Sequence, residues 1–272
     1  MRPKAIFTVL ALAVTSTRAR AQELSCAEYV GQTIKPVSFA SAVAPISKLP
    51  PKDEFETTAD FEKRRASALT SLPSTLVIAK APEDLKYFQY DAETRKLQII
   101  TYAFQNLPFR ISWAVSSAGM DEKIDVSPLY NVEVVVSSLD KSTGTYQATN
   151  GYGAKTEVLK VHRTTAAIFD RKADDWEHAQ LFEAADKPPY VVGELEMSPE
   201  EARRLKPGLK LALVVTPKAP YLITGTHEPY KVTMDNPMDI TEDFAILIAD
   251  IRCGLVTDAA NKVLGAYPTR RN

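Results

Sequence analysis

The chain contains 272 residues, of which 45% are hydrophobic and 25% are charged, and its formal net charge is −1. A chain of this length can bury a substantial apolar core. Its nearly balanced charge provides no basic surface of the kind that binds nucleic acid or an anionic membrane surface, so neither is an expected partner.

The N-terminus has the pattern of a secretory signal peptide. Arg2 and Lys4 precede an apolar run at 5–14, which is too short to span a bilayer as a stable helix but long enough for the apolar part of a signal. The tripeptide A-R-A at 19–21 matches a cleavage site. We therefore expect residues 1–21 to be removed and the mature protein to be periplasmic or secreted. An uncleaved anchor is the alternative.

Cleavage would change the charge balance, because four basic residues and no acidic ones lie in this signal. Of the 33 basic residues 29 would remain against 34 acidic residues, which gives a net charge of −5. No later stretch is long and apolar enough for a second membrane segment. We expect no stable membrane span after cleavage.

Two cysteines, Cys26 and Cys253, lie near opposite ends of the mature chain. Outside the cytoplasm, an even pair without C-x-x-C spacing predicts one structural disulfide, which would tie the chain ends together. Lipidation of Cys26 is the alternative. The preceding residues E-L-S lack the branched apolar residue that a lipidation motif requires, and charged residues separate them from the apolar run.

The mature chain begins with residues 22–52, which we expect to be an extended segment. Its part at 33–52 is rich in proline and small residues, which predicts an extended course over the surface. A helix is expected over 57–72. Thr57 is a good N-cap with Asp60 three residues later, and Pro73 follows the last helical residue.

Two arginines of this helix are candidate docking or ligand-binding charges. Arg65 stands within an apolar stripe that also contains Phe61 and Leu69. Because a long arginine stem can lie along apolar surface, we interpret Arg65 as fastening the helix where Phe61 and Leu69 pack on a sheet. Arg64 is expected to pair with Asp60, four residues earlier. A ligand-binding role for Arg64 and Arg65 is the alternative.

Alternating polar and apolar residues predict strands over most of the remaining chain. The expected strands are 75–79, a hairpin within 86–104 with its turn at 91–96, 129–139, 144–149, 154–170, 209–216, 221–226, and a C-terminal hairpin of 244–257 and 262–267. Further helices are expected at 174–186 and at 198–206, the latter with Ser198 as N-cap and Pro199 in the first turn. The pattern predicts an α+β fold, mainly antiparallel β-sheet with two or three packed helices, in a single domain over 53–272.

The phrase F-E-T-x-x-x-F-x-x-R, formed by Phe55, Glu56, Thr57, Phe61 and Arg64, precedes the hairpin segment Y-D-A-E-T-R-K-L-Q-I. Together with N-G-Y-G-A-K-T-E-V-L-K-V and S-P-E-E-A-R-R-L-K-P-G-L-K-L-A-L-V-V, it resembles segments of uncharacterised secreted bacterial proteins. The resemblance implies an extracytoplasmic globular protein and assigns neither an activity nor site residues.

Asp174 and His178 are the best candidates for a metal site. Their i, i+4 spacing would place a carboxylate and an imidazole on one helix face. A third ligand would have to come from a distant segment, so a solvated acidic helix face is the competing interpretation.

The remaining polar clusters match no metal motif. His227 is followed by Glu228, but Lys231 occupies the fifth position of H-E-x-x-H. His162 is expected on the exposed face of a strand. The acidic run at 234–243 has oxygen ligands for calcium but lacks the spacing of an EF-hand, so a turn is the favoured interpretation.

The sequence lacks the G-x-S-x-G, P-loop and S-x-x-K signatures of common catalytic sites. We therefore expect an exported, non-enzymatic binding or accessory module of the cell envelope or the medium, without a cofactor. An envelope protein or a surface polymer is the expected partner. The alternative is a secreted hydrolase that uses carboxylates, either without a metal or assisted by a metal near Asp174 and His178.

Overall fold

The computed structural model describes residues 24–50, 52–69, 73–80, 87–100, 103–104, 132–170, 190–228 and 231–269. In chain order the elements are η1 (Cys26–Tyr29), α1 (Phe39–Ser47), α2 (Thr58–Leu69), β1 (Leu76–Lys80), β2 (Phe88–Asp91), β3 (Lys96–Ile100), β4 (Val132–Thr149), β5 (Lys155–Asp170), β6 (Val191–Glu196), α5 (Pro199–Leu205), η4 (Lys206–Gly208), β7 (Lys210–His227), β8 (Met238–Thr257) and β9 (Val263–Pro268). They confirm the predicted α+β fold with mainly antiparallel strands.

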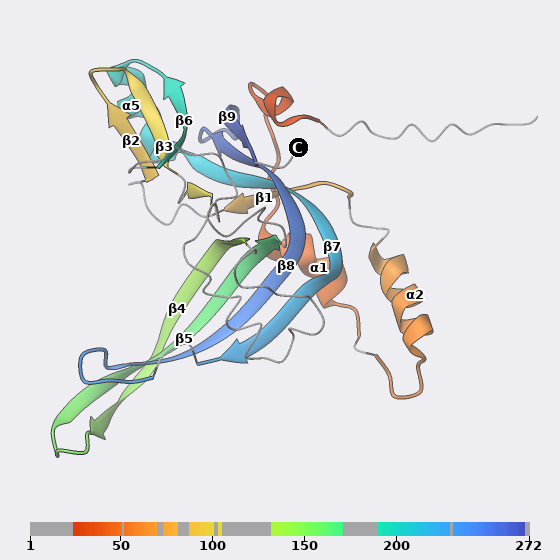
Figure 1. The fold of residues 1–272 in the computed structure, drawn as a ribbon, viewed down its shortest axis with the longest axis vertical. Helices are drawn as coiled ribbons and strands as arrows, with labels where there is room; N and C mark the ends of the chain where they lie inside the picture. The colour runs from red at the N-terminus through yellow and green to blue at the C-terminus, as the bar shows by residue number, and fades with distance from the viewer. Residues whose placement is uncertain are drawn as a thin grey trace, which may run out of the picture.

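The strands form two sheets (Figure 1). The larger sheet has six strands in the order β1-β7-β8-β5-β4, with β9 also paired to β8, and it curves into a half-barrel. The smaller sheet has the order β2-β3-β6, and α5 covers one of its faces. β5 and β8 run parallel, whereas the other paired strands of the described residues are antiparallel.

The large sheet buries apolar side chains on both faces, because successive residues of a strand point to opposite sides. On the face that we call inner, Ile168, Leu213 and Leu247 belong to the main core. On the outer face, Phe169 and Ile246 belong to a second apolar cluster. Each such side chain contributes about 1.5–3 kcal/mol when fully buried. Burial on both faces explains the nearly continuous apolar runs in β5 and β8.

The N-terminal segment packs across the end of the large sheet where β9 lies. Tyr29 and Ile34 form an apolar cluster with residues of β7, β8 and β9. Val37 then runs beside β1, with backbone hydrogen bonds of 2.9 Å to Val77 and from Ala79. These contacts fix the course of the chain up to the start of α1.

Helix α1 lies within the segment that the prolines predict to be extended, so that prediction is wrong for residues 39–47. The Ser38 side chain caps the helix by accepting a backbone hydrogen bond of 3.1 Å from its first turn. Phe39 and Val43 are buried where α1 packs against β1 and β7. Burial of this apolar face outweighs the cost of Pro45 inside the helix.

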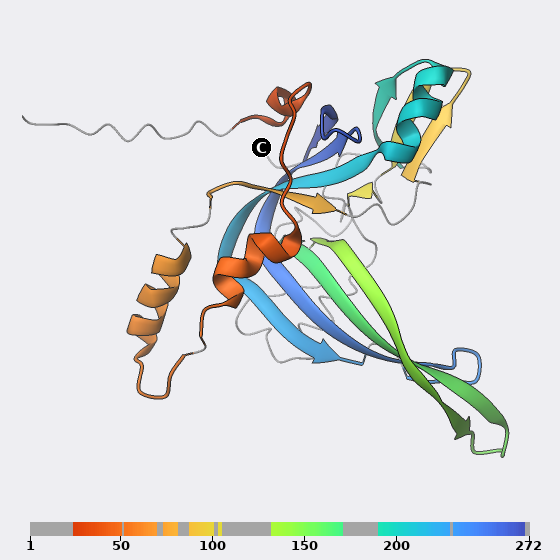
Figure 2. The same ribbon diagram turned by 180° about the vertical axis from the view of Figure 1, so that it is seen from behind.

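Helix α2 begins where the sequence predicts. The Thr57 hydroxyl accepts a hydrogen bond from the Asp60 backbone N–H at 3.1 Å and donates to the Asp60 carboxylate at 2.6 Å. The predicted end at Leu72 lies outside the described residues. The helix packs beside α1 (Figures 1 and 2), and its Arg65 contacts the ring of Tyr221 in β7.

The β2–β3 hairpin and α5 also confirm their predictions. In the hairpin turn, an Asp91 carboxylate oxygen accepts the Glu93 backbone N–H at 2.9 Å. Ser198 caps α5 by accepting the Glu201 backbone N–H at 3.2 Å. The helix predicted at 174–186 lies outside the described residues. Within the described part of the chain, no helix has the length and apolar character needed to cross a membrane.

β4 and β7 each unite two strands that the sequence separates, and both separations were wrong. In β4 the pairing register shifts between Ser142 and Gly144, and Gly144 has a φ of 134° that favours glycine. In β7 the register shifts between Pro217 and Leu222. Glycine and proline here mark irregularities within a strand and do not end it.

The small sheet contacts the half-barrel around Tyr267 of β9. A Cβ atom added to Gly193 of β6 would lie 1.8 Å from Cε1 of Tyr267, so the two strands meet at a position where only glycine fits. Phe88 and Leu97 of the small sheet belong to the same apolar core as the inner face of the half-barrel. Burial raises the pKa of the Tyr267 hydroxyl far above its ordinary value.

Candidate functional site

A cavity of about 820 Å³ is bordered by α1 and by residues of the strands β1, β4, β5, β7 and β8. Pockets that enclose small-molecule ligands have volumes of about 300–1,000 Å³ and are mostly apolar. The described residues that line this cavity are Pro36, Ser38, Phe39, Ala40, Val43, Ala79, Lys80, Val136, Ser137, Thr164, Thr165, Ala166, Lys210, Leu211, Ala245, Thr257 and Asn261. Within the described part of the chain, its size and its lining make it a candidate binding site.

One wall of the cavity is the first half of α1, which contributes Phe39 and Val43. The Ser38 cap fixes where this helix starts, and the backbone bonds of Val37 attach the preceding residues to β1. The wall is therefore held by the sheet on which it lies.

Small side chains on β5 and β8 make room for the cavity. Ala166 and Ala245 are register partners in the parallel pairing of these strands, and both line the cavity. Farther along the same face, Ile168 and Leu247 are fully buried in the core. The two alanines leave space where larger side chains would fill the inner face.

Two lysines line the cavity, whereas none of its described lining residues is acidic. Lys80 ends β1 and is only 2% exposed. The Lys210 ammonium donates to the Ala259 carbonyl at 2.8 Å and to Asn261 Oδ1 at 3.1 Å.

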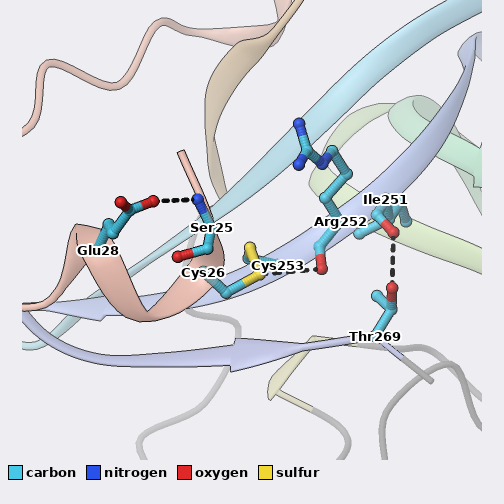
Figure 3. Close-up of a disulfide and its surroundings, with 7 residues drawn as sticks. All are labelled: Ser25, Cys26, Glu28, Ile251, Arg252, Cys253 and Thr269. Carbon is cyan, nitrogen blue, oxygen red and sulfur yellow. Dashed lines mark hydrogen bonds between the residues drawn. A yellow bond between two sulfur atoms is a disulfide. The ribbon is translucent and has the colours of Figure 1, made fainter. Parts of the chain in front are cut away.

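The predicted disulfide between Cys26 and Cys253 is confirmed and ties η1 to β8 (Figure 3). Their Cα atoms are 5.8 Å apart, within the usual range for a disulfide. The Cys26 sulfur is therefore not available for lipidation in this structure. The Thr269 hydroxyl donates to the Ile251 carbonyl at 3.1 Å beside the disulfide.

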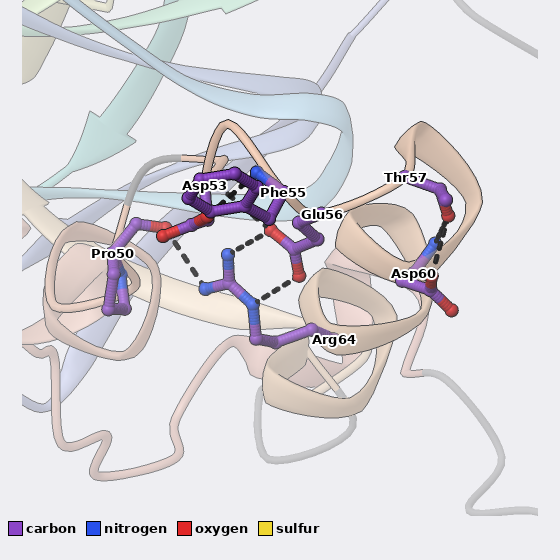
Figure 4. Close-up of polar contacts among 7 residues, drawn as sticks. All are labelled: Pro50, Asp53, Phe55, Glu56, Thr57, Asp60 and Arg64. Carbon is purple, nitrogen blue, oxygen red and sulfur yellow. Dashed lines mark hydrogen bonds and ion pairs between the residues drawn. The ribbon is translucent and has the colours of Figure 1, made fainter.

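Arg64 binds Glu56 and not Asp60, so the predicted pairing within the helix is wrong. Two guanidinium nitrogens of Arg64 donate to the two Glu56 oxygens at 2.9 and 2.7 Å, and a third donates to the Pro50 carbonyl at 3.0 Å (Figure 4). These hydrogen bonds lower the pKa of Glu56 and raise the pKa of Arg64. Asp60 instead binds the Thr57 cap. Arg64 thus ties the turn before α2 to the helix.

Arg65 bridges α2 and the large sheet. Its guanidinium lies 5.5 Å from the ring centroid of Tyr221 in β7 and 3.2 Å from a carboxylate oxygen of Glu62. This geometry favours the fastening role over ligand binding, and the choice between the two roles stays a prediction. Neither arginine lines the cavity.

His227 contacts a buried carboxylate on the outer face. Its Nε2 lies 3.2 Å from Glu242, which is 1% exposed and also accepts a hydrogen bond from the Thr165 hydroxyl. A hydrolase that used Thr165 as nucleophile would need its hydroxyl to contact the imidazole. Here the hydroxyl contacts the carboxylate, so the three groups are not arranged as a catalytic triad.

His162 and the acidic run of β8 form a separate contact. His162 Nε2 lies 3.0 Å from Asp243, and its side chain is partly exposed as predicted. β8 begins at Met238, so the turn predicted over 234–243 was wrong for the second half of that run. Glu242 and Asp243 are consecutive in a strand and point to opposite faces. Among the described residues, no three groups suited to metal binding come together.

Asp174 and His178 lie outside the described residues, so their metal hypothesis stays a prediction. The cavity residues were missed by sequence reasoning. A signal for Lys80 was present, because strand alternation places it on the same side as Leu76 and Ile78. The facing alanines gave no such signal, since the register of β5 and β8 cannot be read from the sequence.

Comparison with known proteins adds no relative. No protein-family model matches this chain, and neither a curated protein nor a solved structure matches it. The resemblance to uncharacterised secreted bacterial proteins therefore stays a prediction.

Proposed function

We propose that this protein is an exported, non-enzymatic binding module that holds a ligand with a large apolar body in the half-barrel cavity. The observation that carries the proposal is the cavity of about 820 Å³, whose lining surface is mainly apolar and one wall of which is α1. Ligand pockets of this kind combine an apolar lining with a few polar groups.

The geometry of the polar clusters supports binding over catalysis. The Thr165 hydroxyl contacts Glu242, and Glu242 in turn contacts His227, so no nucleophile is paired with a base in this set. Among the described residues that line the cavity, the charged ones are Lys80 and Lys210, and the Lys210 ammonium is bound to Ala259 and Asn261. The hydrolase alternative uses carboxylates, and its optional metal site at Asp174 and His178 lies outside the described residues.

The binding part of the proposal is tested with N-phenyl-1-naphthylamine, an uncharged probe whose fluorescence rises in apolar surroundings. The purified protein, with its disulfide intact, should bind the probe with saturation. Ala166→Leu places a larger side chain in the cavity beside Ala245. It should weaken probe binding by about tenfold, which corresponds to about 1.4 kcal/mol of binding free energy.

The matched control is Ala66→Leu, which adds the same atoms to an exposed position of α2. Equal probe binding by the wild type and the Ala66→Leu protein, with weaker binding by Ala166→Leu, supports the proposal. Equal binding by all three proteins, or no saturable binding, would contradict it.

Export is tested on protein recovered from the envelope fraction or the medium. We expect its N-terminus to be Gln22. Recovery of the chain only in the cytoplasmic fraction, with Met1 retained, would contradict this part of the proposal.

A further inference from the structure

The inner face of the large sheet becomes polar next to the cavity. Thr164 of β5 and Ala245 of β8 line the cavity, and Ala245 packs against the main core of the inner face. β5 and β8 pair residue by residue over 159–169, so side chains alternate regularly between the two faces here. His162 and Asp243 each lie two positions earlier in the same strands and therefore share the inner face. Two positions span about 7 Å along a strand, so this polar pair borders the cavity lining.

Asp243 holds the His162 ring in place through one of its two nitrogens. His162 Nε2 lies 3.0 Å from one carboxylate oxygen of Asp243, and the other oxygen accepts a hydrogen bond from the Thr226 hydroxyl at 2.5 Å. A hydrogen bond at one ring nitrogen fixes the orientation of an imidazole. The other nitrogen, Nδ1, has no hydrogen-bond partner among the described residues, and the His162 side chain is 41% exposed. His162 therefore offers an oriented, accessible polar atom beside an apolar cavity.

From this arrangement we infer that the ligand is an uncharged apolar alcohol, whose hydroxyl binds Nδ1 of His162 while its apolar body occupies the cavity. This inference rests on the function proposed above and adds the chemical class of the ligand. A hydroxyl suits Nδ1 in both protonation states, because it can donate to a neutral ring and accept from a charged one. Asp243 and Lys141 carry opposite charges on either side of His162, which favours an uncharged group over an ionic one. Asp243 acts as a positioning residue for the ring.

The test compares two isomers, 1-dodecanol and 1-methoxyundecane, of which only the first has a hydroxyl. Each is used below its solubility limit to displace N-phenyl-1-naphthylamine from the protein. The alcohol should displace the probe at a concentration about fivefold lower than the ether. In a site without a partner for the hydroxyl the ether would be the stronger ligand, because the alcohol loses more hydration on binding. Equal potency, or a stronger ether, would overturn the inference while leaving the proposed function in place, whereas absence of saturable probe binding would overturn both.

Histidine variants locate the hydroxyl. His162→Phe keeps an aromatic ring but removes both nitrogens, so it should abolish the preference for the alcohol while the probe still binds. His227→Phe makes the same change on the outer face, and this matched control should keep the full preference. Asp243→Ala releases the His162 ring and should reduce the preference several-fold, so it tests the inference even if His162→Phe fails to fold. Thermal unfolding checks that each variant is folded. An undiminished preference in Asp243→Ala and in folded His162→Phe would overturn the assignment of the hydroxyl to His162.

Discussion

The two ends of the large sheet differ in how they are held. At one end, β7, β8 and β9 pack against the N-terminal segment, and the disulfide joins η1 to β8. At the other end, residues 145–157 of the β4–β5 hairpin project beyond the start of β8 (Figure 1). We call the first the closed end and the second the arm. No residue of the arm is buried, and Tyr152 at its tip is fully exposed.

This difference shows that strand pairing and the burial of apolar side chains contribute separately to the stability of the fold. The arm keeps the same antiparallel hydrogen bonds as the rest of the β4–β5 pair. A net backbone hydrogen bond contributes about 0.5–1.5 kcal/mol, whereas a fully buried apolar side chain contributes about 1.5–3 kcal/mol. We therefore expect most of the stability to reside at the closed end and in the core, and substitutions in the arm to be tolerated. The predictions below test this contrast.

Loss of the disulfide should have the largest effect on the closed end. The Cys26→Ser and Cys253→Ser double variant removes a link between residues 227 positions apart. In the loop-entropy model such a link stabilises the fold by up to about 5 kcal/mol. Urea unfolding should show this decrease in the free energy of unfolding. The wild-type protein under reducing conditions is the control and should match the variant, while an unchanged unfolding midpoint would contradict the prediction.

The same leucine truncation should have unequal effects in the core and in the exposed part of β4. Leu247 is fully buried, and Leu247→Ala should lower the free energy of unfolding by about 2–5 kcal/mol. Leu139 of β4 is 71% exposed, and Leu139→Ala should change the free energy of unfolding by no more than about 0.5 kcal/mol. Thermal or urea unfolding measures both changes. Similar losses in the free energy of unfolding of the two variants would show that burial does not determine how much a leucine contributes to stability.

Glycine substitutions test the contact between the two sheets. Gly193→Ala places a methyl group 1.8 Å from Cε1 of Tyr267, so that ring or the strand must move. We expect a loss of about 1–3 kcal/mol in the free energy of unfolding. Gly151→Ala at the tip of the arm is the control, because its Cβ would meet no atom within 4 Å. If Gly193→Ala were as stable as Gly151→Ala, the close approach of β6 and β9 would be wrong.

The smallest effect concerns the ion pair before α2. Arg64 lowers the pKa of Glu56, so the carboxylate binds protons less readily in the folded than in the unfolded protein. Its contribution to stability is therefore present above the ordinary pKa of glutamate and is lost as the pH falls through the lowered value. The protection of the α2 amides against hydrogen exchange, relative to their intrinsic exchange rates at each pH, should decrease over this pH range in the wild type.

The matched variants for this ion pair are Glu56→Gln and Glu62→Gln. Glu56→Gln should remove the pH-dependent part of the protection of α2, because no carboxylate remains to be protonated at that position. Glu62→Gln changes a neighbouring carboxylate that does not bind Arg64, and it should keep the wild-type pH profile. An unaltered profile in Glu56→Gln would show that this pair does not hold α2.

The elements that could be predicted from the sequence are those whose signals are local. Thr57 with Asp60 marks the start of α2, Ser198 with Pro199 marks α5, and Asp91 marks the turn of the β2–β3 hairpin. Each of these residues makes its defining hydrogen bond or turn within a few positions of the chain. Local signals therefore gave the correct element type in these regions.

The features that could not be predicted depend on distant parts of the chain. Helix α1 forms despite Pro45 because its apolar face packs on β1 and β7, and β7 continues past Pro217 because β8 holds both of its halves. Ala166 and Ala245 lie side by side because β5 and β8, which are far apart in the sequence, pair in parallel in this register. The candidate cavity depends on these distant contacts, so no local pattern could reveal it.

The position of β8 has a consequence for the order of folding. β8 follows β5 and β7 in the chain and is hydrogen-bonded to β5, β7 and β9. Until β8 joins the sheet, β5 and β7 each present an edge that lacks its eventual neighbour, and such edges can pair with those of another chain. Assembly of the half-barrel must therefore wait for its most central strand, and this interval is when the growing or refolding chain is most prone to aggregate.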